Sequence, residues 1–106
     1  KTEPTLEQLK EFWEWCGFGK DGIGNITYPG STKYKPIYGG AGYPPLDLNN
    51  LFKYAVKDDW DIHFYPDKVS QTIDCVITLP GGKEYDGSGN THKEALFWAI
   101  WEVVKK

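Results

Sequence analysis

The strongest constraint on the fold is a period of two in the second half of the sequence. Apolar and polar residues alternate over residues 60–65 and again over residues 72–79, as in strands with one buried face. A Pro-Gly-Gly run at 80–82 is typical of a tight turn, after which residues 83–86 can return as a third, short strand. This part of the chain therefore predicts an antiparallel meander of about three strands.

A first helix is expected from about Thr5 to Cys16, where apolar side chains recur at helical spacing. Thr5 and Gln8 have the spacing of a capping box, in which each side chain accepts a hydrogen bond from the other residue's backbone amide. Gly17 can end the helix in a left-handed conformation.

Residues 17–46 form a loop rich in Gly, Tyr and Pro, with a composition that favours turns and a loose hairpin between residues 26–28 and 34–38. Asp47 is then the expected N-cap of a short helix that runs through Val56. So long a loop is unusual in a compact domain and is often functional or mobile.

The 106 residues suit one domain, because a chain of this length cannot build two hydrophobic cores. The predicted class is α+β: an antiparallel sheet packed against N- and C-terminal helices in the order α-loop-α-β-β-β-α. We therefore expect a single α+β domain over residues 1–106, with residues 17–46 as a loop insertion.

Charge and composition argue against several function classes. The net charge is −3, and all twelve basic residues are lysine, so the forked guanidinium that reads guanine and phosphate is missing. No apolar run reaches the length of a membrane span, and we expect a cytoplasmic protein with reduced Cys16 and Cys75. The absence of methionine predicts processing or trimming from a longer precursor.

The last helix, His92 to Lys106, opens at Thr91, which has capping-box spacing to Glu94. On a helical wheel Trp98 falls within the charged stripe, and Trp101 lies at its edge. Either the long loop covers Trp98, or both tryptophans anchor a partner or a second copy of the chain, since tryptophan is enriched at binding hot spots.

The loop carries a second set of candidate binding residues that interleaves basic and aromatic side chains. Such a set can stack on single-stranded nucleic acid or on a sugar, although packing within the loop is the preferred interpretation. Its members are Tyr28, Lys33, Tyr34, Lys35 and Tyr38.

No catalytic constellation is visible, and we expect no enzyme activity, metal or cofactor. His63 and His92 have no nucleophile at a suitable spacing. The acidic residues 58, 59 and 61 beside His63 lack the glycine turn and closing glutamate of a calcium loop. The Gly-Ser-Gly run at 87–89 can either turn the chain or offer amides to an anion at the start of the last helix.

Three segments are rich in aromatic and aliphatic residues: LKEFWEWCGF at 9–18, LDLNNLFKYAV at 46–56 and ALFWAIW at 95–101. They resemble a family of short, uncharacterised proteins of phages, prophages and their bacterial hosts, which is similar to phage sandwich-type domains of layered helices and sheet. The resemblance implies an intracellular, phage-related origin. It brings no activity, so no residue inherits a role.

The order of helix, three strands and a last helix opened by residues 87–95 resembles a double-stranded RNA-binding domain. Such domains contact phosphates and 2′-hydroxyls. Only Lys93 stands where that family has a cluster of lysines, and Glu94 follows it.

The leading hypothesis is a small non-enzymatic phage- or prophage-type protein that binds a protein partner, or itself, through exposed aromatic residues. The alternative is nucleic-acid binding by a domain like those that bind double-stranded RNA, which the sequence disfavours. Sugar binding by the Tyr and Trp side chains is a third possibility.

Overall fold

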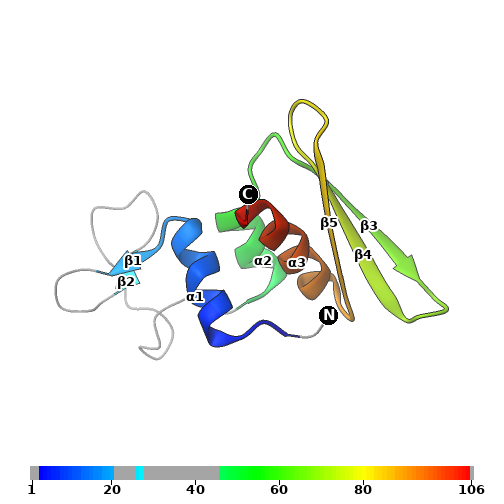
Figure 1. The fold of residues 1–106 in the computed structure, drawn as a ribbon, viewed down its shortest axis with the longest axis horizontal. Coiled ribbons are helices and arrows are strands. Elements are labelled where there is room, and N and C mark those ends of the chain that lie inside the picture. The colour runs from blue at the N-terminus through cyan, green and yellow to red at the C-terminus, as the bar shows by residue number, and fades with distance from the viewer. Residues whose placement is uncertain (1–2, 21–25, 28–45, 106) are drawn as a thin grey trace. The chain divides into compact units, whose positions relative to one another are not determined.

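The computed structural model describes residues 3–20, 26–27 and 46–105. The chain divides into two compact units, which we call the N-terminal unit (Pro4–Pro45) and the sheet unit (Leu46–Lys106 together with Lys1–Glu3). Helices and a three-stranded antiparallel sheet follow one another in the order α-β-β-β-α, which confirms the predicted α+β class (Figure 1).

In the N-terminal unit, helix α1 (Leu6–Trp15) begins as its sequence predicts. The Thr5 hydroxyl accepts a hydrogen bond from the Gln8 amide at 3.1 Å, and the Gln8 side chain accepts one from the Thr5 amide at 2.9 Å. Gly17, with φ of 108°, ends the helix in the left-handed region. The buried Trp13 ring packs edge-on against Phe18, with 5.4 Å between ring centroids.

The same unit contains a short hairpin that the sequence analysis did not predict. Strand β2 (Ile26–Thr27) pairs antiparallel with β1 (Gly19–Lys20). The pairing joins segments that are close in sequence, so closing the intervening loop costs little entropy. Residues 34–38 lie outside the described residues, as does most of the predicted loop insertion.

The sheet unit contains β3 (Asp61–Asp67), β4 (Thr72–Thr78) and β5 (Glu84–Gly89), in that spatial order and all antiparallel. The first two strands match the predicted ones to within one or two residues. Strand β5 is longer than predicted, because residues 87–89 belong to it. The prediction that these residues form a turn or an anion-binding loop is therefore wrong.

Helix α3 (His92–Val104) packs along one face of this sheet and contacts mainly β5 and β4 (Figure 1). The contact is so close at β5 that only glycine fits there. A Cβ atom at Gly87 would overlap the backbone nitrogen of Ala99 and lie 2.5 Å from the carbonyl carbon of Trp98. A Cβ atom at Gly89 would lie 2.5 Å from that of Glu94. These glycines let the helix backbone approach the strand.

The start of α3 partly follows the predicted capping box. The Thr91 hydroxyl accepts a hydrogen bond from the Glu94 amide at 3.3 Å. The Glu94 carboxylate accepts its bond from the Asn90 amide at 3.0 Å, one residue before the N-cap. This use of its carboxylate explains how Glu94, a charged residue, can be buried at the helix start.

The short helix before the sheet also differs from its prediction. Asp47 is the N-cap, and its carboxylate accepts a hydrogen bond from the Asn50 amide at 2.8 Å. The α-helical part, α2 (Leu48–Asn50), then widens into a π-helix, η2 (Leu51–Ala55). Apolar spacing does not separate the two forms, because either one can place Leu51 and Ala55 on the same buried side. None of the helices in the described residues could cross a membrane, since none is both long and apolar enough.

Candidate functional site

The two tryptophans predicted as binding residues are buried. Trp98 is 6% exposed and Trp101 is 9% exposed, so the expectation that they present free aromatic surface is wrong. The Phe97 ring lies between them, edge-on to Trp98 at 4.9 Å and stacked on Trp101 at 5.9 Å. The helical wheel failed because α3 contacts α2 and η2 as well as the sheet, so its charged stripe does not mark a solvent-facing side.

The other predicted binding residues, Tyr28, Lys33, Tyr34, Lys35 and Tyr38, lie outside the described residues. As predicted, Cys16 and Cys75 do not form a disulfide, and both are buried. Burial raises the pKa of the Cys75 thiol from its ordinary value of 9.0 to about 12, which makes this thiol a poor nucleophile.

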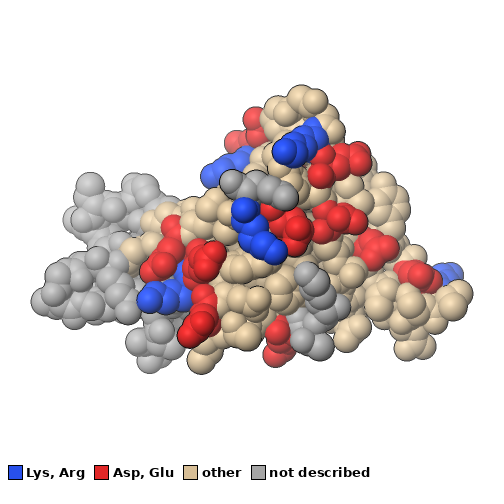
Figure 2. Space-filling view, viewed as in Figure 1, with Lys and Arg blue, Asp and Glu red and all other residues tan. Residues whose placement is uncertain are grey.

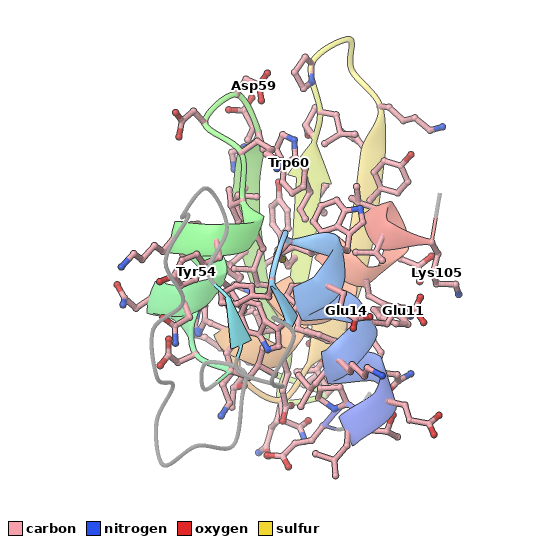
Figure 3. All side chains as sticks on the ribbon, turned by 90° about the vertical axis from the view of Figure 1, so that its left-hand side faces the viewer. Glu11, Glu14, Tyr54, Asp59, Trp60 and Lys105 are labelled. Atoms are coloured by element: carbon pink, nitrogen blue, oxygen red, sulfur yellow. The ribbon has the colours of Figure 1, made fainter. Side chains whose placement is uncertain are left out.

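The acidic residues before and within β3 do not gather into a metal site. Asp59 lies at the outer end of the turn that leads into β3 (Figure 3). In residues 3–20, 26–27 and 46–105, no three His, Cys, Asp or Glu side chains come together as metal ligands would. His63 and His92 are both exposed, and the His92 ring packs edge-on against Phe64 at 4.8 Å between centroids.

The sheet has a face that α3 does not cover, which we call the open face. Residues next to each other on a strand point to opposite faces, so the register assigns every side chain to one of them. Cys75 and Gly87 are partners on the covered face, and so are Ile77 and Tyr85. The residues between them make up the open face: Asp61, His63, Tyr65, Asp67, Thr72, Asp74, Val76, Thr78, Glu84, Asp86 and Ser88.

The open face is acidic. Five of its eleven side chains are carboxylates and none is lysine, and all five carboxylates are exposed. Figure 2 shows acidic side chains across the surface over the strands and α3. In residues 61–105 the lysines are Lys68 and Lys83 in the two turns, Lys93 in the first turn of α3 and Lys105 after α3. The face therefore offers hydrogen-bond acceptors and negative charge.

An aromatic pair lies on the β3 side of the open face. The rings of His63 and Tyr65 stack with 6.3 Å between centroids and 27° between planes, and Tyr65 is 55% exposed. Exposed tyrosine beside carboxylates combines apolar contact area with polar surroundings, as binding surfaces commonly do.

Asp67, at the end of β3, has a structural role. Hydrogen bonds from the Ser70 side chain and from the Val69 and Ser70 amides lower the pKa of the Asp67 carboxyl. The Val69 amide donates to this carboxylate at 2.9 Å. Asp67 thus fixes the turn between β3 and β4, and it remains exposed and charged.

Two shallow hollows lie along β5. One, of about 330 Å³, is lined by Asp74, Asp86, Gly87, Ser88 and Glu102, the last from α3. The other, of about 260 Å³, is lined by Val76, Glu84, Tyr85 and Asp86. Three carboxylate residues line the first hollow, so it suits an ammonium or guanidinium group better than an anion or an apolar group.

Sequence reasoning missed the open face as a site, although part of the signal was present. Asp61 and His63 were noted as acidic-patch residues, and the alternation in 72–79 places Asp74 away from the core. The contribution of Asp86 and Ser88 could not be found from the sequence, because β5 was expected to end at residue 86.

Comparison with known proteins does not add to this picture. No protein-family model, curated protein or solved structure matches the chain.

Proposed function

We propose that this chain is a non-enzymatic protein-binding domain that docks a positively charged partner protein on the open face of its sheet. The observation that carries the proposal is the charge pattern of that face, where five carboxylates stand without a lysine among eleven positions.

Electrostatic complementarity supports a basic partner. An acidic surface raises the rate of encounter with a positive patch and disfavours negative partners. Tyr65 and the adjoining His63 add exposed ring surface, and Tyr65 has the rigid amphipathic side chain that is enriched in interface cores. This keeps the hypothesis of protein binding through exposed aromatics but moves it from α3 to β3.

The same charge pattern disfavours nucleic acid on this face. Phosphates carry a dense negative charge, and proteins neutralise it with lysine and arginine. Neither Trp98 nor Trp101 is exposed enough to stack on bases. The resemblance of three segments to phage and prophage proteins supports a role for this binding in the cytoplasm of the host cell.

The test uses oligolysine as a basic probe of the open face. We expect saturable binding at about 20 mM salt that weakens at least about tenfold near 200 mM, because exposed charges are screened. Amide NMR shifts should change at Asp61, His63 and Asp74 on the open face.

A pair of variants of equal charge makes the test specific. Asp61→Lys with Asp74→Lys reverses two carboxylates on the open face, and we expect it to abolish binding. Asp58→Lys with Asp59→Lys makes the same charge change in an exposed turn off the face, and we expect it to lower affinity less than about threefold. Equal losses of affinity in both variants would mean that binding depends on the net charge of the chain and not on this face. Saturable binding of duplex RNA or single-stranded DNA would favour the nucleic-acid alternative.

A further inference from the structure

The outer edge of β5 has backbone groups without partners in the described residues. Strand β5 lies at one end of the sheet, and within residues 46–105 it pairs only with β4. The Leu79 amide donates to the Lys83 carbonyl at 2.8 Å, so the odd-numbered residues of β4 and β5 exchange the hydrogen bonds between these strands. The amides and carbonyls of Glu84, Asp86 and Ser88 therefore point outward.

The opposite edge of the sheet, on β3, is less able to accept another strand. The even-numbered residues of β4 bond to β3 at its odd-numbered residues, which leaves Ile62, Phe64 and Pro66 with outward backbone groups. Pro66 has no amide hydrogen, so a donor is missing from that edge. Strand β5 keeps all three outward donors.

The hollow lined by Asp74, Asp86 and Glu102 lies at this same edge of β5. Asp74 and Asp86 belong to the open face, whereas Glu102 comes from α3, which packs on the covered face. A strand added beside β5 would direct alternate side chains to the two faces. It would thus meet carboxylates on both sides.

Resting on the proposed function, we propose that the outer edge of β5 binds an extended, lysine- or arginine-containing segment of the partner protein as a fourth strand. The backbone of the segment pairs with Glu84, Asp86 and Ser88. Its cationic side chains reach Asp74 and Asp86 on one side and Glu102 on the other. Lys83 directly precedes Glu84, so the cations of the partner are best placed opposite Asp86.

A second copy of the chain fits this edge poorly. Two β5 strands side by side would bring Glu84 and Asp86 of one copy against the same carboxylates of the other. Like charges directly opposite on paired strands are destabilising. Charge complementarity therefore selects a basic partner over self-association.

The experiment compares oligolysine with oligolysine that is N-methylated at every backbone amide. Methylation of every amide keeps every charge but removes the donors along both edges of the peptide. We expect at least about a tenfold loss of affinity, corresponding to about 1.4 kcal/mol. In the complex with the unmethylated peptide, the amides of Glu84, Asp86 and Ser88 should become slower in hydrogen exchange.

A variant of the chain tests the same edge from the other side. Ser88→Pro removes one outward donor without changing the charge, and we expect at least about a fivefold loss of oligolysine affinity, whereas Ser88→Ala should bind like the wild type. The methylated peptides keep the inference testable if the proline variant does not fold.

The outcomes separate the two proposals. Equal binding of methylated and unmethylated peptides, with shifts spread over Asp61, His63 and Asp74, would overturn strand addition and leave the proposed function standing. Absence of binding by every form of the peptide would overturn both. Tight binding of the unmethylated peptide alone, with protection on β5, would support both.

Discussion

The two faces of the sheet differ sharply although the same three strands supply both. The covered face carries buried Cys75 and Ile77. Where α3 passes over β5, the residues on this face are the glycines Gly87 and Gly89. The open face carries carboxylates, hydroxyls and the His63–Tyr65 pair, and it contributes little burial. One face thus accounts for stability, and the other is free to vary for binding.

The sharpest test of this division is Gly87→Val. A side chain here would overlap the backbone of α3, and a helix backbone cannot move aside locally. We expect loss of cooperative folding, or destabilisation by more than about 3 kcal/mol, in urea unfolding followed by circular dichroism. The control is Ser88→Val on the open face, which should cost less than about 1 kcal/mol. A stable Gly87→Val variant would contradict the packing of α3 on β5.

A smaller effect is expected for Ile77→Ala. The side chain is fully buried, so its removal leaves a cavity and should cost about 2–5 kcal/mol. Val76→Ala, the neighbouring position on the open face, should cost less than about 1 kcal/mol because that side chain is only partly covered. Denaturant midpoints of the two variants give the comparison directly. Equal costs would mean that the open face is also packed in solution.

The smallest effect concerns the Cys75 thiol at alkaline pH. Its folded-state pKa of about 12 lies above its ordinary value of 9.0, because burial disfavours the thiolate. The resulting contribution to stability is present below about pH 9 and is lost as the pH rises toward 12. Between pH 9 and 10 we expect this thiol to lower the free energy of unfolding of the wild type by about 1 kcal/mol. Urea unfolding at several pH values measures this, and Cys75→Ala should lack that part of the pH dependence. Identical slopes of unfolding free energy against pH for both proteins would show that Cys75 is accessible.

Much of the local structure was predictable because it depends on near neighbours in the sequence. Thr5, Asp47 and Thr91 cap helices through bonds to residues three positions away, and Gly17 needs only its own freedom to adopt a positive φ. The alternation over residues 60–65 and 72–79 placed β3 and β4 correctly for the same reason.

The predictions that failed involved groups far apart in the sequence. The exposure of Trp98 depends on which elements surround α3, and the wheel of a single helix carries no such information. The role of residues 87–89 was misread because a glycine that admits a helix backbone has the same composition as a glycine in a turn. The candidate site could not be predicted for the same reason, since Asp74 and Asp86 share a face only through the register of β4 and β5.

The sequence by itself determined where α1, α3, β3 and β4 lie, where helices are capped, and that one face of β4 is buried, because period and capping act over a few residues. Only the tertiary structure decided that α3 is enclosed, that β5 reaches Gly89, and that the carboxylates of three strands gather on one face. Those features depend on register and helix packing, in which residues many positions apart contact one another.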